Sequence, residues 1–168
     1  MAVLPLRTFG DPVLREKCFS VNEITDEVKK LVKDLEDTLH DLEGVGLAAP
    51  QIGILKKVFV VDLEEGPVAY INAEIIAKED QVEEEEGCLS VPPVRANVKR
   101  YKKIKVKSLN IEGEEEVFEA SGLLAKAIQH EVDHINGTLV LDRLDQKERN
   151  KAMSELRELD LFLRENAR

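Results

Sequence analysis

Residues 122–137 read GLLAKAIQHEVDHING, and their apolar side chains recur three and four positions apart. This spacing is typical of an α-helix that buries one face. Ser121 can cap the start of the helix, and Gly137 can end it. We therefore predict a helix over about residues 122–136, and we expect this helix to lie at the centre of the fold.

The same helix carries residues suited to metal chemistry. His130 and His134 are four positions apart, so both imidazoles lie on one face and can reach one cation. Glu131 lies about 100° further round the helix, where its carboxylate can act as general base on a water at the metal. The HExxH pattern also occurs by chance on structural helices, but the chain has only three histidines and two of them are here. The stretch therefore indicates a metal centre.

A catalytic metal site usually has three protein ligands and one open position, so two histidines leave it incomplete. Cys88 is the best candidate for the third ligand, because it lies in an irregular segment before two prolines and a thiolate binds Zn²⁺ or Fe²⁺ well. An isolated cysteine is more often a small buried apolar residue, and this alternative stays open at this point. We expect Cys18 to be buried structure and His40 to be structural or exposed.

The other segments predict an α+β fold, with mixed or antiparallel sheets packed around the metal-binding HExxH helix and with a C-terminal helix. We expect one domain over residues 1–168. Residues 44–53 are predicted to form a loop, and Glu83 to Glu85 a solvated surface. Helices are predicted from Asp11-Pro12, over 28–42 with Gly44 as its stop, and from Asp145 with Leu163 facing the body; strands are predicted over 57–62, 68–76, 103–109, 115–120 and 138–141.

Composition restricts the kind of partner. The chain has 168 residues and a net charge of −10, which argues against nucleic-acid binding. No apolar run approaches the roughly 20 residues of a membrane span, and no signal peptide is visible. With only two cysteines, a disulfide framework is not expected. We therefore expect an acidic cytoplasmic protein without membrane association or sequence-specific nucleic-acid binding.

Three segments resemble the signature motifs of peptide deformylases. They are GVGLAAPQ at 44–51, EGCLS at 86–90 and QHEVDH at 129–134, in the order of the family and at about its spacing. The amino-terminal FGDPVLR is also similar to the family, and the likeness covers roughly residues 5 to 145. The resemblance implies an enzyme that removes the formyl group from formyl-methionine at the start of nascent polypeptides and releases formate.

The resemblance also implies a role for each site residue. Cys88, His130 and His134 match the metal ligands, and Glu131 matches the catalytic acid–base. Gln51, through its side-chain amide, and Leu89, through its backbone N–H, match the donors to the oxyanion. The implied ion is Fe²⁺, with Zn²⁺, Ni²⁺ or Co²⁺ able to replace it. From the residues themselves, Gly44, Val45 and Gly46 offer backbone without bulk, against which an extended peptide substrate can bind.

Several alternatives remain at this point. An HExxH metallopeptidase, or an inactive family member that only binds the ribosome, would share parts of these motifs. Lys126 lies where many family members carry an apolar residue beside the substrate groove. It is either a solvated lysine or a source of preference for acidic residues in the peptide. The C-terminal helix is a candidate for contact with the ribosome, although its mixed charge fits a plain surface helix equally well.

Overall fold

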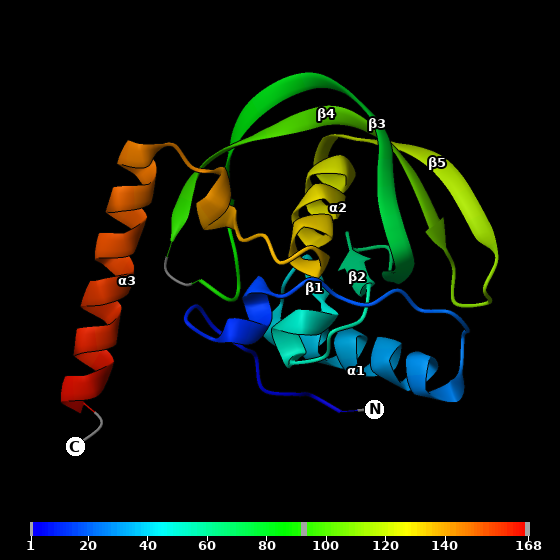
Figure 1. Cartoon of the computed structure of the whole chain (residues 1–168), viewed down its shortest axis with the longest axis horizontal. Coiled ribbons are helices and arrows are strands. Elements are labelled where there is room, and N and C mark those ends of the chain that lie inside the picture. Colours follow the sequence, from blue (N-terminus) through cyan, green and yellow to red (C-terminus); the bar gives the residue numbers. More distant parts are fainter. Residues whose placement is uncertain (1, 92–93, 167–168) are drawn as a thin grey trace.

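The computed structural model describes residues 2–91 and 94–166, and within them the chain is α+β with one five-stranded antiparallel sheet (Figure 1). Of the two expected alternatives, mixed or antiparallel, the antiparallel one is confirmed for the described residues, in which the parallel pairing is an isolated bridge between Phe19 and Lys56. The strands, in sheet order, are β1 (Gly46–Ala48), β2 (Val58–Asp62), β3 (Pro67–Gly87), β4 (Arg95–Leu109) and β5 (Glu115–Ser121).

Three α-helices and three short 3₁₀ helices complete the described part of the chain. They are α1 (Asp26–Leu42), α2 (Gly122–Ile135), α3 (Gln146–Asn166), η1 (Pro12–Arg15), η2 (Ala49–Ile52) and η3 (Val140–Arg143). None of these helices is both long enough and apolar enough to cross a membrane.

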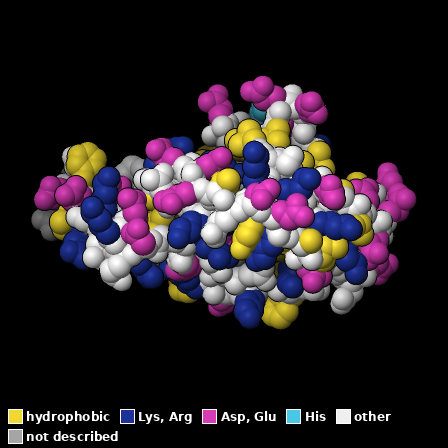
Figure 2. Space-filling view, turned by 90° about the horizontal axis from the view of Figure 1, so that it is seen from above, with side chains coloured by type: hydrophobic (Ala, Val, Ile, Leu, Met, Phe, Trp, Pro, Cys, Tyr) yellow, Lys and Arg dark blue, Asp and Glu magenta, His cyan; other side chains and the backbone are white. Residues whose placement is uncertain are grey.

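The long strands β3 and β4 curve over α2 as an arch (Figure 1). The strand predicted over residues 68–76 is the first part of β3, and it is irregular, with register shifts between Ile71 and Glu74 and between Ile75 and Ala77. β3 is much longer than predicted, because β4 pairs with it along its acidic part: Glu79 lies opposite Lys103 and Glu83 opposite Lys99, whereas Glu84 lies opposite Val98 and Glu85 opposite Asn97. Glu83 to Glu85 are exposed as expected, and Figure 2 shows acidic and basic side chains interspersed over this side of the molecule.

The short strands β1 and β2 lie between α1 and α2. Val58 and Val60 belong to the apolar cluster that α1 covers, whereas Phe59 and Val61 belong to the cluster that α2 covers. Successive side chains of a strand point to opposite faces, so β2 is buried on both sides and reads as a continuous apolar run. This packing fixes α2, and with it both histidines, in the middle of the molecule.

The predicted loop over residues 44–53 is instead the short strand β1 followed by η2. Its small residues give no strand signal, and β1 forms because β2 provides a hydrogen-bonding partner. α1 ends at Leu42, and Glu43, not Gly44, takes the left-handed conformation with φ of 53°. Gly44 is closely packed, because a Cβ there would lie 2.9 Å from the terminal Cδ1 atoms of Leu39 and of Leu89, and both side chains would have to shift.

Three other expectations need correction or completion. The predicted strand over 138–141 overlaps η3 instead, where the Asp142 carboxylate accepts a hydrogen bond from the Leu139 N–H at 2.9 Å and turns the chain. Ser121 precedes α2 as predicted, but its side chain makes no capping hydrogen bond. The irregular segment expected around Cys88 is described as far as Val91, and the two prolines that follow, Pro92 and Pro93, lie outside the described residues.

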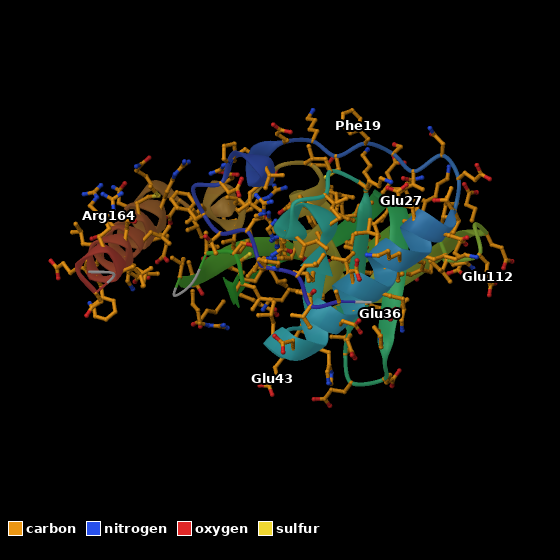
Figure 3. All side chains as sticks on the ribbon, turned by 90° about the horizontal axis from the view of Figure 1, so that it is seen from below. Phe19, Glu27, Glu36, Glu43, Glu112 and Arg164 are labelled. Atoms are coloured by element: carbon orange, nitrogen blue, oxygen red, sulfur yellow. The ribbon has the colours of Figure 1, made fainter. Side chains whose placement is uncertain are left out.

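The C-terminal helix α3 packs on the body through its first half alone. Ala152 is buried, and Met153 and Leu156 are partly buried beside an apolar cluster of strand β4 and η3. Leu163, predicted to face the body, is 56% exposed, because the second half of α3 extends away from the sheet (Figure 1). Seen from below, Arg164 lies far from α1, at the opposite end of the molecule from Glu112 (Figure 3).

Candidate active site

Three potential ligand atoms meet at the centre of the molecule. The Cys88 Sγ atom lies 3.3 Å from Nε2 of His134, and Nε2 of His130 lies 3.2 Å from the same nitrogen. All three ligand atoms are within 4.8 Å of one another. Both histidines come from α2, and Cys88 follows the last residue of β3, so the β3–β4 arch brings the thiol to the helix.

The arrangement of the two imidazoles fits a divalent transition metal. Nδ1 of His130 lies 2.8 Å from a Glu86 carboxylate oxygen, which leaves the Nε2 lone pair of His130 directed at the other donors. Nδ1 of His134 is buried without a hydrogen-bond partner. Burial, together with the nearby positive charges of His130 and Arg100, lowers the pKa of His134 well below its ordinary value. A thiolate and two imidazole lone pairs directed at one point suit such an ion.

Proton binding at His130 competes with a cation. Burial opposes its ionisation, but hydrogen bonds with Cys88 and Glu86 raise the pKa of His130 well above its ordinary value. A metal that takes this nitrogen as a ligand must therefore displace a proton.

Glu131 lies beside the three ligand atoms and is almost completely buried. Burial raises the pKa of its carboxyl group to about 7, and Oε1 has no hydrogen-bond partner. The other oxygen has room because residue 46 is glycine: a Cβ at Gly46 would lie 2.9 Å from Glu131 Oε2. A buried carboxyl group with a pKa near neutrality is suited to taking up and releasing a proton.

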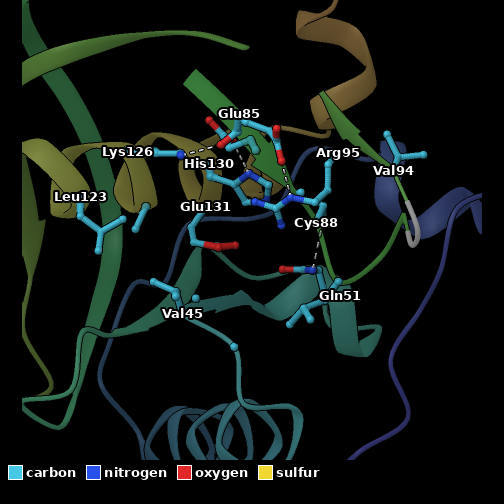
Figure 4. A pocket seen from close by; sticks show the side chains of 16 residues that line it. Val45, Gln51, Glu85, Cys88, Val94, Arg95, Leu123, Lys126, His130 and Glu131 are labelled. Carbon is cyan, nitrogen blue, oxygen red and sulfur yellow. Dashed lines mark hydrogen bonds and ion pairs between the residues drawn. The ribbon is translucent and has the colours of Figure 1, made fainter. Parts of the chain in front are cut away.

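The side-chain amide of Gln51 is held in one orientation. Its Oε1 accepts a hydrogen bond from the Ala48 N–H at 3.0 Å, and its Nε2 donates to Ser90 Oγ at 3.1 Å. Nε2 is also 3.9 Å from Cys88 Sγ. The NH₂ group of Gln51 therefore faces the ligand cluster, and Figure 4 shows it pointing at Cys88 across the cavity.

These groups line a cavity of about 520 Å³ that opens to solvent (Figure 4). Two exposed apolar residues, Val45 and Leu123, lie on different walls of it. The cavity includes every site residue predicted from the sequence except His134, which is buried behind it; these are Gly44, Val45, Gly46, Gln51, Cys88, Leu89, His130 and Glu131.

Lys126 also lines the cavity, and it is neither free nor freely solvated. Its side chain is 22% exposed, and its Nζ donates a hydrogen bond to the Glu85 carbonyl oxygen at 2.7 Å. A second contact reaches the Glu84 carboxylate at 3.6 Å. Lys126 thus links α2 to β3. One helical turn later, His130 of α2 makes a second link to β3 through Glu86.

Sequence reasoning did not find the buried charges around His130. Glu86 lies in the EGCLS segment, but nothing in the sequence indicates that it alone of the acidic run is buried. Its partner Arg100 is buried on β4, although in the sequence it looks like one more basic residue of a basic strand. The available signal is the period of two along the strand, because Arg100 falls on the same face as the apolar Ala96 and Val98.

Comparison with known proteins is consistent over sequence and fold. Residues 3–150 match the family described as Polypeptide deformylase. A peptide deformylase of Clostridium botulinum is 48% identical over 147 residues, which cover 88% of this chain and 100% of that protein. One of Desulfitobacterium hafniense is 47% identical over 149 residues, covering 89% of this chain and 99% of that protein.

Solved structures of peptide deformylases are similar to this chain in fold and in sequence. A crystal structure of a peptide deformylase from Legionella pneumophila has a TM-score of 0.91 and 37% identity, and covers 99% of both chains. A peptide deformylase from Synechococcus elongatus in complex with actinonin has a TM-score of 0.86 and 40% identity, covering 90% of this chain and 85% of that one. The chain therefore belongs to the peptide deformylase family, the metal-dependent hydrolases that remove the N-formyl group from nascent peptides.

Proposed function

We propose that this protein removes formyl groups with one divalent metal ion held by Cys88, His130 and His134. The observation that carries the proposal is the meeting of these three ligand atoms, within 4.8 Å of one another, beside a buried carboxyl group in an open cavity. A divalent cation there supplies positive charge next to the substrate carbonyl and lowers the pKa of water towards about 7.

Protein groups perform the remaining steps. Glu131 takes the proton from the attacking water and then delivers it to the departing amine. The oxyanion that forms as the formyl carbon becomes tetrahedral accepts hydrogen bonds from Gln51 Nε2 and from the backbone N–H of Leu89. The fixed orientation of the Gln51 amide supports this role, because the donor is in place before the reaction starts.

The shape of the cavity supports the choice of substrate. Gly44, Val45 and Gly46 present backbone to a peptide that enters in extended form. A formyl group carries only hydrogen beyond its carbonyl, so a tight fit beside the metal would admit it and exclude larger acyl groups. Methionine is the first residue that the family's role implies.

The identity of the metal ion and the place of the protein in the cell are proposed from ligand chemistry and from the family. Fe²⁺ is proposed as the working ion, with Zn²⁺, Ni²⁺ or Co²⁺ as replacements, although Zn²⁺ binds such ligands more tightly. A thiolate ligand to Fe²⁺ makes the enzyme sensitive to oxygen. The proposed location is the cytoplasm, where the substrate arises and thiols stay reduced, and the proposed domain covers residues 1–168.

We also propose that the projecting half of α3 contacts the ribosome. Leu161, Phe162 and Leu163 are all more than half exposed at the end of a helix that leaves the body. These three residues follow one another within one turn of the helix, and exposed apolar surface of this kind is available for binding a partner.

The rival functions have less support. HExxH metallopeptidases commonly take a third ligand after the pentad, and this chain has no histidine after His134. The relatives compared above are named peptide deformylases throughout. An inactive binding module would have no need of Gln51 and Glu131 in these orientations.

The first prediction concerns the general base. Glu131→Gln should lower the rate of formate release from a formyl-Met peptide by about 10²–10⁴-fold, because a carboxamide cannot take up the proton. Metal content per chain should stay at the wild-type level, because Glu131 is not a ligand. Near wild-type formate release in this variant would refute the role of Glu131, and cleavage of internal peptide bonds without formate release would favour a metallopeptidase.

The second prediction concerns the stability of the metal-free protein. The pKa of Glu131 is raised from 4.5 to about 7, so the stability that this group contributes is present at low pH and is lost as pH rises through 7. Glu131→Gln should therefore gain stability over wild type between pH 5 and pH 8, by roughly 2–3 kcal/mol. Urea unfolding of both chelator-treated proteins at the two pH values measures the gain, and an equal difference at both would contradict it.

The third prediction tests the ribosome contact without removing the packed half of α3. Replacing Leu161, Phe162 and Leu163 by Ser should reduce co-sedimentation with ribosomes while formate release from a free peptide stays unchanged, because the cavity lies far from this end of the helix. Serine at the exposed Val68 and Val117 serves as the matched control, since it removes apolar surface elsewhere. Equal co-sedimentation of both variants and wild type would contradict the proposed contact between α3 and the ribosome.

A further inference from the structure

Four charged side chains of alternating sign form a chain that starts at the surface and ends on His130. The Arg143 guanidinium donates to both oxygens of Asp133, at 2.7 and 3.1 Å. Nη1 of Arg100 donates to Asp133 at 2.6 Å. Arg100 also donates twice to Glu86, at 2.9 Å from both Nε and Nη2. Glu86 Oε1 lies 2.8 Å from Nδ1 of His130.

The inner members of this chain are buried, whereas Arg143 is not. The side chains of Glu86 and Arg100 are both 5% exposed, that of Asp133 is 10% exposed, and that of Arg143 is 48% exposed. Two buried carboxylates need two cations, because a buried charge without a partner is costly. Without Arg143, Arg100 would be the only arginine in contact with either carboxylate. With Arg143 on Asp133, two of the three Arg100 donors in use go to Glu86.

We propose that Arg143 is a positioning residue of the metal site, which acts through Asp133, Arg100 and Glu86 to hold His130 as a metal ligand. The inference rests on the proposed metal ligands. Arg143 lies in η3, Asp133 in α2, Arg100 in β4 and Glu86 in β3, so the chain of charges joins four elements around one imidazole. Hydrogen-bonded partners of ligands typically alter metal affinity by about 10–100-fold when removed.

Positioning and simple charge make opposite predictions for the loss of Arg143. If Arg143 acts through its charge alone, removing it makes the site more negative and tightens the binding of a cation. If Arg143 keeps Arg100 on Glu86, its loss lets Asp133 draw Arg100 away, frees the His130 ring to turn, and weakens binding. The sign of the change in metal affinity therefore separates the two roles.

The test compares Arg143→Ala with Arg15→Ala by titrating Co²⁺ into the metal-free full-length proteins. Arg15 is a matched control, because its side chain is 41% exposed and it pairs with Asp142, the neighbour of Arg143. We expect the dissociation constant for Co²⁺ to rise about tenfold in Arg143→Ala, with a changed visible absorption of the bound ion, and to stay near the wild-type value in Arg15→Ala. Thermal unfolding of each variant checks that it is folded at the temperature of the titration.

Tighter or unchanged Co²⁺ binding by Arg143→Ala would overturn the proposal, as would equal weakening in Arg15→Ala. Adding Arg143→Ala to Glu86→Gln should weaken binding no further, because the effect passes through Glu86; should the Glu86 variant not fold, the comparison of the two arginine variants decides alone. Failure of wild type to bind one Co²⁺ with thiolate-to-metal absorption would instead refute the proposed metal ligands.

Discussion

The hydrogen bond between the Glu86 carboxylate and Nδ1 of His130 is the interaction on which the site depends. It joins the strand that leads to Cys88 to the helix that carries both histidines, and it directs the other nitrogen of His130 at the ligand cluster. Burial by itself would raise the pKa of Glu86, but hydrogen bonds from Arg100 and His130 outweigh it and lower that pKa to about 2. The carboxylate therefore stays ionised at neutral pH and keeps the imidazole in one orientation.

Burial of Glu131 destabilises the metal-free protein and at the same time suits this residue for catalysis. Glu131 is buried with one oxygen unpaired, and an ionised carboxylate there is unfavourable in the metal-free protein. The same burial gives it a pKa near neutrality, which a general base requires. Gly46 leaves the space that this carboxylate occupies, so backbone without a side chain is needed on the wall where a peptide is proposed to bind.

The pattern of apolar residues in the sequence was sufficient to predict α1, α2 and β2, because each of these elements buries a regular set of apolar side chains. It also placed His130, His134 and Glu131 on neighbouring faces of one helix. Cys88 could not be assigned from its own chemistry, since a lone cysteine is usually a small buried residue; the surrounding EGCLS segment implied its role.

What the sequence did not predict depends on contacts between distant segments. β1 has no strand pattern of its own and exists because β2 pairs with it. The acidic run belongs to β3 because β4 pairs with it, with Lys99 opposite Glu83. Arg100 and Asp133 are charged residues at buried positions, and pairing with each other, with Glu86 and with Arg143 makes that burial tolerable. X-ray absorption at the metal edge of the Zn²⁺-loaded protein tests the proposed ligands most directly. We expect one sulfur at about 2.3 Å and two imidazole nitrogens at about 2.0–2.1 Å, whereas a ligand shell of nitrogen and oxygen without sulfur would rule out Cys88 as a ligand.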